Sequence, residues 1–281
     1  MYHERLRDFF LIFHGKILGG NMDIVVCVKR VPDTNEADIQ ISGDSINTKG
    51  LPFDVNEWDK YVIEEAVRLK EKHGGTVTAI TMGDDQSEDV LRRAFATGAD
   101  AAIRISDDAF KGSDAIAQAK VLAAAISGVK HDLVFFGAQA SDDGFGATGQ
   151  AAAALLNLPY ASLAVGLEIE GGKARVTREL EAGMNEVVEI PLPALITMQS
   201  GINEPRYVSI MGIRKASSKE IKVFTSGDIA VNAAETGAGS ATTTEKLFVP
   251  PVLKQTEFIT GSIDEMAVKM ANILKEKGGT I

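Results

Sequence analysis

A chain of 281 residues, 45% of them hydrophobic, is long enough to bury one large core with appendages. Its 39 acidic residues outnumber its 29 basic residues, and the net charge of −10 argues against nonspecific binding to nucleic acid or to an anionic membrane. The single cysteine, Cys27, excludes an internal disulfide framework and a cysteine-rich metal site, and the four histidines show no metal-ligand spacing.

The first residues carry a short apolar patch, Phe9 to Phe13, that is bounded by charges and followed by no small-residue cleavage motif. This patch is too short to span a bilayer. Because strand-like residues follow Met22 at once, we expect residues 1–21 to be an extension and the folded domain to begin at residue 22. No targeting signal is recognised, so we expect a cytoplasmic protein without stable membrane insertion and without bound nucleic acid.

Strand and helix patterns alternate from residue 24 to residue 156. This alternation is typical of βα units and predicts a mostly parallel sheet with helices on both faces. The expected helix 57–73 has an apolar face that includes Val62, and we expect Glu64 and Glu65 to lie on its solvated face. The expected strands are residues 24–28, 76–82, 101–105 and 132–136, the other expected helices are 87–97, 113–127 and 148–156, and residues 38–49 are expected to form a β-hairpin.

The pattern changes after Pro159. Residues 162–170 and 173–180 flank a Gly-Gly turn and predict an antiparallel pair, which is followed by expected strands at 186–190 and 194–197. The fold class is therefore α/β, with a mostly parallel doubly wound sheet, an antiparallel extension and a tethered C-terminal helix.

That terminal helix is expected at residues 262–277, where Ser262 and Glu265 have the spacing of a capping box. A stretch rich in Gly, Ala, Ser and Thr begins after Asp228 and predicts a linker to this helix. The helix either docks on a partner or folds back onto its own domain, and the residues alone leave both alternatives open.

The most informative stretch connects the expected strand 132–136 with the expected helix 148–156. Gly137 opens a polar loop, GAQASDDGFGATGQ, that leads directly into the helix. Open α/β sheets bind ligands where the carboxyl end of a parallel strand meets a helix N-terminus, because free N–H groups and the helix dipole favour a phosphate there. We therefore expect a nucleotide site in this loop, and a merely flexible connection is the plainer alternative.

No strand-linked GxGxxG opens the chain, no GxxxxGK occurs before Ser or Thr, and no GxSxG nucleophile motif is present. Asp142 and Asp143 are adjacent, so they point in different directions and are interpreted as loop ligands or solvated caps. Asn56 is an N-cap candidate, and Lys29 and Arg30 either face a phosphate or are solvated. We expect no catalytic residue and no metal ligand, so a bound cofactor would carry any chemistry.

Four segments carry a family likeness: VKRVPD at 28–33, EEAVRLKEK at 64–72, GAD at 98–100 and VTRELEAGMNEVVEIPLPALIT at 176–197. Together they resemble the β subunit of electron transfer flavoproteins, over about the whole of residues 22–281. Ala182 departs from the family signature, which usually has an acidic residue or glycine at this turn.

The resemblance implies one half of a heterodimer that does not turn over a substrate itself. It implies electron transfer from flavin dehydrogenases, such as acyl-CoA dehydrogenases, to an electron-transfer quinone oxidoreductase. In such proteins the α subunit holds most of the FAD, and the β subunit contributes part of the FAD pocket and binds AMP. Residues 22–228 would then form the nucleotide-binding domain, and residues 229–281 the linker and the C-terminal helix that docks on the α subunit.

The family's AMP site maps onto strand ends, a helix start and the glycine loop. Gly146 and Ala147 replace the Asn-Gln of many relatives, so two side-chain contacts are lost. Electron-bifurcating members bind a second FAD here, typically with Val-Gly-Pro where this chain has Thr-Gly-Gln, which favours AMP and leaves the second FAD as the alternative. The AMP-site residues implied by the resemblance are Cys27, Asn56, Glu57, Trp58, Asp59, Met82, Gly137, Ala138, Gln139, Ala140, Ser141, Asp142, Asp143, Gly144, Phe145, Gly146, Ala147 and Thr148.

The segment QSGINEPRY at 199–207 is similar to the family's recognition loop, which docks an aliphatic side chain into a pocket of the dehydrogenase. Ile202 would be that anchor, and a buried loop isoleucine is the plainer alternative. The implied recognition residues are Ile202, Asn203, Glu204, Pro205, Arg206 and Tyr207. Two other classes of function stay open: a stand-alone adenine-nucleotide-binding module and a hydrolase or transferase of adenine nucleotides.

Overall fold

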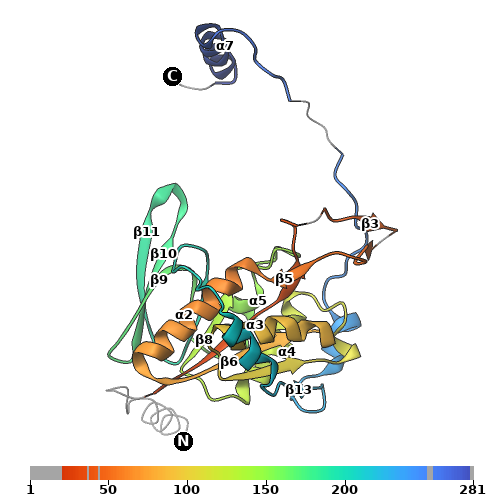
Figure 1. Ribbon diagram of the computed structural model, residues 1–281, viewed down its shortest axis with the longest axis vertical. Coiled ribbons are helices and arrows are strands. Elements are labelled where there is room, and N and C mark those ends of the chain that lie inside the picture. Colours follow the sequence, from red (N-terminus) through yellow and green to blue (C-terminus); the bar gives the residue numbers. More distant parts are fainter. Residues whose placement is uncertain (1–20, 37, 44, 252–255, 279–281) are drawn as a thin grey trace, which may run out of the picture. The chain divides into compact units, whose positions relative to one another are not determined.

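The computed structural model describes residues 21–36, 38–43, 45–251 and 256–278 (Figure 1). The chain divides into two compact units: a core that contains Asn47–Glu245 and the chain up to Ile39, and a smaller unit that contains Gln40–Ile46 and the chain from Lys246 onward. The expected extension 1–21 lies outside the described residues, apart from its last residue.

A nine-stranded sheet runs through the core in the order β11-β10-β9-β12-β8-β1-β6-β7-β13. Its strand pairs are parallel, except that β10 runs antiparallel to both β9 and β11. The expected α/β class, with a mostly parallel sheet and an antiparallel extension, is confirmed. The strands are β1 (Met22–Cys27), β6 (Gly75–Met82), β7 (Ala101–Ile105), β8 (Leu133–Gly137), β9 (Tyr160–Glu170), β10 (Lys173–Glu179), β11 (Asn185–Pro191), β12 (Ala194–Met198) and β13 (Lys222–Phe224).

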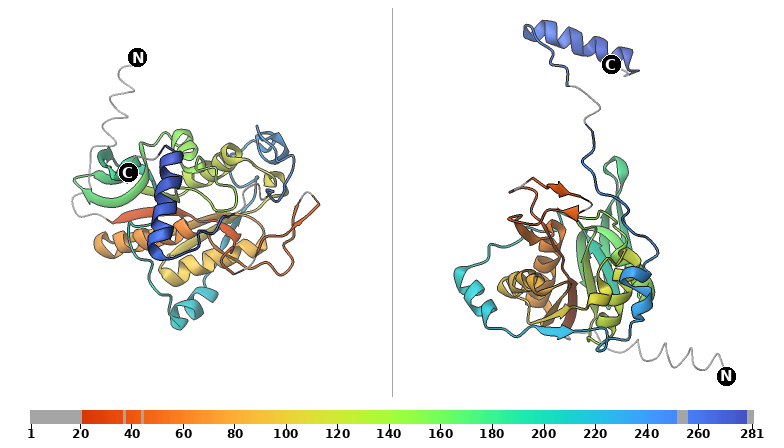
Figure 2. Two further views of the ribbon diagram at one scale, coloured as in Figure 1. Left: turned by 90° about the horizontal axis from the view of Figure 1, so that it is seen from above. Right: turned by 90° about the vertical axis from the view of Figure 1, so that its right-hand side faces the viewer.

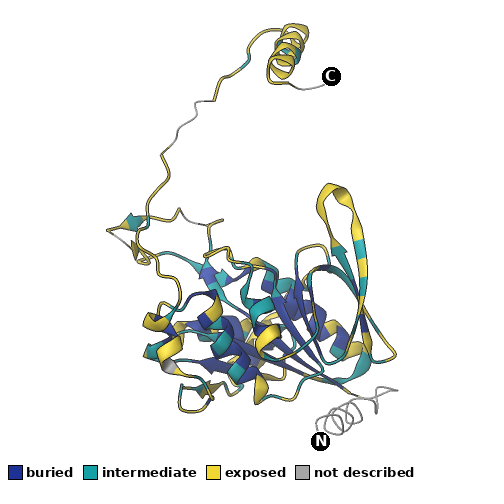
Figure 3. Cartoon of the chain, turned by 180° about the vertical axis from the view of Figure 1, so that it is seen from behind, coloured by how far each residue is buried: buried dark blue, intermediate teal, exposed yellow. Residues whose placement is uncertain are grey.

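Helices cover both faces of this sheet (Figure 2). On one face, α2 and α3 pack with Ile24 and Val26 of β1, and on the other face α4 and α5 pack with Val25 and Cys27. Successive side chains of a strand point to opposite faces, so residues 24–27 of β1, which is covered on both faces, are all apolar and buried (Figure 3). The helices of the core are α2 (Glu57–His73), α3 (Glu88–Thr97), α4 (Ala115–Ser127), α5 (Thr148–Leu155) and α6 (Ile210–Ser217), and its 3-10 turns are η1 (Asp85–Ser87), η2 (Asp108–Phe110), η3 (Glu181–Gly183), η4 (Ala233–Glu235) and η5 (Gly237–Gly239).

Every strand and helix of the expected βα series is present, with ends that differ by at most two residues. The sequence patterns did not reveal α6, the edge strand β13, or the short antiparallel pair of β2 (Arg30–Pro32) and β5 (Phe53–Val55).

The stretch 229–245 packs on the core, although its composition predicted a linker. Thr236 is buried, and Thr242 N–H donates to Asp114 Oδ2 at 3.0 Å. A Cβ on Gly237 would lie 2.3 Å from a backbone oxygen, that of Ala109. The small residues of this stretch therefore allow close packing, which composition alone does not distinguish from looseness.

The smaller unit contains the expected hairpin, β3 (Ile41–Ser42) with β4 (Ser45–Ile46), and the expected terminal helix, α7 (Ile263–Glu276). The capping box is confirmed, since Ser262 Oγ accepts from Glu265 N–H at 3.4 Å and Glu265 Oε2 accepts from Ser262 N–H at 2.8 Å. Of the helices that the structure describes, none has the length and apolar character needed to cross a membrane.

Candidate functional site

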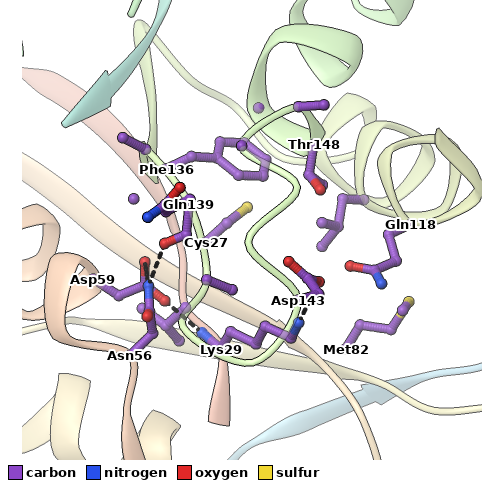
Figure 4. Close-up of a pocket in the computed structure, with 18 residues that line it drawn as sticks. Cys27, Lys29, Asn56, Asp59, Met82, Gln118, Phe136, Gln139, Asp143 and Thr148 are labelled. Carbon is purple, nitrogen blue, oxygen red and sulfur yellow. Dashed lines mark hydrogen bonds and ion pairs between the residues drawn. The ribbon is translucent and has the colours of Figure 1, made fainter. Parts of the chain in front are cut away.

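A pocket lies where the carboxyl ends of β1, β6 and β8 meet α4 and α5 (Figure 4). The chain passes from β1 to β6 and β7 on one side and then returns to β8 on the other side of β1, so the strand order reverses at β1. Open α/β sheets bind ligands at such a switch point. The pocket is lined by Cys27, Val28, Lys29, Asn56, Asp59, Met82, Gln118, Leu122, Phe136, Gly137, Ala138, Gln139, Ala140, Asp143, Gly146, Ala147, Thr148 and Gly149.

The loop after β8 is held by Asn56, which precedes α2. Asn56 Nδ2 donates to the backbone oxygen of Gln139 at 3.0 Å, and Asn56 Oδ1 accepts from Ser141 N–H at 3.2 Å. The same Nδ2 also donates to Asp59 Oδ1 at 3.1 Å. Asn56 makes no side-chain capping bond to α2, so the expected capping role of its oxygen is wrong. The oxygen is bound to the loop instead.

The carboxylate of Asp59 lies beside Gly137 in the wall of the pocket, and the residue is only 4% exposed. Asp59 Oδ2 accepts from Lys29 N–H at 2.7 Å. Burial raises the pKa of Asp59 to about 7, although hydrogen bonds from Asn56 and from Lys29 N–H oppose this rise. A Cβ on residue 137 would lie 2.2 Å from Asp59 Oδ1, so only glycine fits at this position.

Lys29 is the single cation among the residues that line the pocket. Its Nζ lies 2.7 Å from Asp142 Oδ1 and 2.8 Å from Asp143 Oδ2. The expectation that these two aspartates point in different directions is wrong, because both carboxylates reach the same ammonium. Burial disfavours the charge of this ammonium, but the two carboxylates outweigh that effect and raise the pKa of Lys29. Lys29 is therefore neither merely solvated nor free, because it joins the end of β1 to the loop.

The helix α5 begins at the pocket with Thr148 and Gly149. Ala147 occupies the N-cap position and has no side-chain oxygen to accept from the first N–H groups of α5. A Cβ on Gly149 would lie 2.6 Å from Thr197 Cγ2, so glycine lets the helix start approach β12 closely. An uncapped helix start beside a pocket suits an anionic ligand group.

The segment 202–207 is fixed to α2. Arg206 Nε lies 2.8 Å from Glu64 and Arg206 Nη1 lies 2.6 Å from Glu71, while Asn203 Nδ2 donates to Glu65 Oε2 at 3.0 Å. Glu64 and Glu65 are 4% and 7% exposed. The expectation that these two glutamates are solvated is wrong, because a segment far along the chain covers them.

The aliphatic residue of this segment is not fully exposed. Ile202 is partly buried and packs against the hydrophobic core, whereas Tyr207 is 93% exposed. The burial of Ile202 thus lies between the two alternatives from the sequence, an exposed anchor for a dehydrogenase and a buried loop isoleucine.

Comparison with known families gives one match that covers more than half of the chain. The family described as "Electron transfer flavoprotein domain" matches residues 45–229. The chain belongs to the electron transfer flavoprotein family, among its beta subunits. The expected resemblance is confirmed, and with it an electron-transfer role and a place beside an alpha subunit.

Similar proteins span nearly the whole chain. The electron transfer flavoprotein subunit beta of Methylophilus methylotrophus is 38% identical over 92% of this chain and 100% of its own length. The subunit of the same name from Thermoanaerobacterium thermosaccharolyticum is 40% identical over 91% of this chain and 99% of its own length. The "Caffeyl-CoA reductase-Etf complex subunit CarD" of Acetobacterium woodii is 38% identical over 91% of this chain and 99% of its own length.

Most of the residues that the flavoprotein resemblance implied come together at the pocket, although they come from four separate parts of the chain. Gln118 and Leu122 of α4 and Phe136 of β8 also line it. Nothing in the local sequence pointed to Gln118 and Leu122, which become neighbours of the loop only once α4 packs beside α5. The implied residues that do not line the pocket are Glu57, Trp58, Ser141, Asp142, Gly144 and Phe145.

Proposed function

We propose that this beta subunit joins an alpha subunit in a heterodimer that shares FAD and holds AMP in the pocket at the switch point. The heterodimer accepts electrons from flavin dehydrogenases, such as acyl-CoA dehydrogenases, and passes them to an electron-transfer quinone oxidoreductase in the cytoplasm. This chain contributes no catalytic residue of its own. The observation that carries the proposal is the pocket itself, whose wall contains Cys27, Asn56, Asp59, Met82 and the glycine loop.

A ligand with one phosphate suits this pocket better than a ligand with two. Its single cation, Lys29, already has two acidic neighbours, Asp142 and Asp143. Every further negative charge brought beside these carboxylates is disfavoured. The start of α5 supplies N–H groups for one phosphate without adding a countercharge.

A second FAD in this pocket, in place of AMP, is the alternative. The Acetobacterium relative, whose name places it in a complex with caffeyl-CoA reductase, is as similar to this chain as the Methylophilus subunit is. The percentage of identity to these two relatives therefore does not decide whether the pocket of this chain binds AMP or a second FAD.

The tail after the core fits a docking role on the alpha subunit. Within the smaller unit, α7 carries exposed apolar side chains, including Ile263 at 81% and Val268 at 61%. Phe258, which precedes the helix, is 82% exposed. Large apolar side chains exposed in this number are typical of a surface that a partner covers.

Replacing Ile202 by alanine is expected to slow electron acceptance from the dehydrogenase about tenfold, with the FAD content unchanged, because an interface anchor contributes about 1.4 kcal/mol or more. The measurement is the rate at which a flavin dehydrogenase and its substrate reduce the FAD of the purified heterodimer.

Ile221→Ala is the matched control, since Ile221 is also a partly buried isoleucine that packs on the same core cluster. A rate that is unaltered in Ile202→Ala, or slowed equally in both variants, removes Ile202 from the recognition site.

A further inference from the structure

The side-chain amide of Asn56 has only one orientation that fits its neighbours. Ser141 N–H can only donate and the Gln139 carbonyl can only accept, so these two backbone groups fix Oδ1 toward Ser141 and Nδ2 toward Gln139. In this orientation the second hydrogen of Nδ2 points at Asp59 Oδ1, 3.1 Å away. We call the loop at 139–141 closed when it is bound to Asn56 in this way. The closed loop therefore requires an acceptor at Asp59 Oδ1.

The neighbours of Asp59 are all donors. Asn56 Nδ2 faces one carboxylate oxygen, Lys29 N–H faces the other, and Gly137 N–H also points at this side chain. The ionised carboxylate accepts from all of these donors, whereas a protonated carboxyl group has lost its charge and carries a hydrogen on one of its two oxygens. Protonation thus weakens the bond to Lys29 N–H or the bond to Asn56.

We propose that Asp59 is a positioning residue that acts through Asn56: its ionised carboxylate holds the loop at 139–141 closed, and its protonation releases the loop and weakens ligand binding. The ligand part of this inference rests on the proposed nucleotide pocket. The loop part concerns this chain alone.

The transition falls near neutrality, because the pKa of buried Asp59 is about 7. Above that pH the loop is closed, and below it the ionised fraction falls about tenfold per pH unit. The charged and titratable groups that face Asp59 among the described residues are Cys27 of β1 and Lys29, with Asp142 and Asp143 joined to Lys29. The Lys29 ion pairs tie the neighbouring part of the loop but contact neither Asn56 nor the Gln139 carbonyl.

The first test measures hydrogen exchange of residues 137–143 in the purified heterodimer between pH 8.5 and pH 5.5, corrected for the intrinsic pH dependence of exchange. Protection is expected to fall as the pH drops through about 7. Asp59→Asn, which keeps the shape of the protonated acid, is expected to give low protection at every pH. Protection that is constant over this range in the unmodified protein overturns the inference, whether or not Asp59→Asn folds.

The second test measures the dissociation constant of AMP over the same pH range. The affinity is expected to fall about fivefold between pH 7 and pH 6 because of Asp59. In Asp59→Asn the affinity is expected to be weak at every pH and to keep only the smaller pH dependence that comes from the phosphate of AMP. Asp108→Asn is the control, because this exposed aspartate pairs with Lys111 and does not line the pocket, and it is expected to keep the pH profile. A profile in Asp59→Asn as large as that of the unmodified protein overturns the inference. If AMP fails to bind at any pH while loop protection still titrates, the proposed ligand is wrong and the role of Asp59 stands.

Discussion

Replacing Gly137 by alanine is expected to empty the nucleotide pocket without unfolding the chain. The new Cβ would lie 2.2 Å from Asp59 Oδ1, 3.2 Å from Trp58 Cβ and 3.3 Å from Asn56 Nδ2. Residue 137 ends a central strand that is paired with β12, so the backbone cannot retreat. Asp59 must move instead, and its bonds to Lys29 N–H and Asn56 are lost.

Overpacking of this kind costs about 2 kcal/mol. When this cost is borne by the AMP-bound form of the pocket, the affinity for AMP falls about thirtyfold. The measurement is the AMP content of the purified Gly137→Ala heterodimer, together with its AMP dissociation constant. Gly128→Ala is the matched control, because a Cβ there has its nearest neighbour, Ala125 O, at an ordinary 3.6 Å. Full AMP content in Gly137→Ala would show that Asp59 and the loop do not form the ligand site.

Replacing Arg206 by alanine is expected to lower the thermal midpoint by about 5 °C and to loosen the segment 202–207. Arg206 neutralises Glu64, whose side chain is only 5% exposed, and it also pairs with Glu71. Removal of the Arg206 side chain leaves the buried carboxylate of Glu64 without its cation, and the neighbouring residue, Glu65, is also acidic. Breaking such a pair costs about 2 kcal/mol here, below the range for fully buried pairs, because the Arg206 side chain is 34% exposed.

The measurement is a thermal melt of the heterodimer beside Arg175→Ala, which breaks an exposed pair with Glu168 at 3.3 Å and is expected to change the midpoint little. Arg206→Lys should give an intermediate midpoint, since lysine keeps the charge but cannot bridge both glutamates with a planar fork. Equal midpoints for Arg206→Ala and Arg175→Ala would contradict the role assigned to this residue.

The βα series of the core could be predicted from sequence because local periodicity reports which side chains are buried. β1 reads as a continuous apolar run from Ile24 to Cys27 because both of its faces are covered, and α2 shows its apolar stripe. Elements without such a pattern were not found. The helix α6 exposes Ile210, Met211 and Ile213, and β13 has only three residues at the edge of the sheet.

The pocket could be predicted in part for a similar reason. Residues at strand ends and on the glycine loop carry a local signal, whereas Gln118 enters from a helix that follows a different strand. Long-range contacts also decide the environment of polar side chains. Glu64 has the sequence context of a solvated residue, yet Arg206, 142 positions further on, buries it. Asn56 looks like a helix cap until the loop lies above it.

The most direct test of the central claim is the nucleotide content of the native heterodimer. The purified complex is denatured, and the released nucleotides are separated and counted against protein. One FAD and one AMP per heterodimer is the result expected for a beta subunit whose pocket holds a single phosphate beside Lys29. Two FAD and no AMP would contradict it and would assign the pocket to a second flavin.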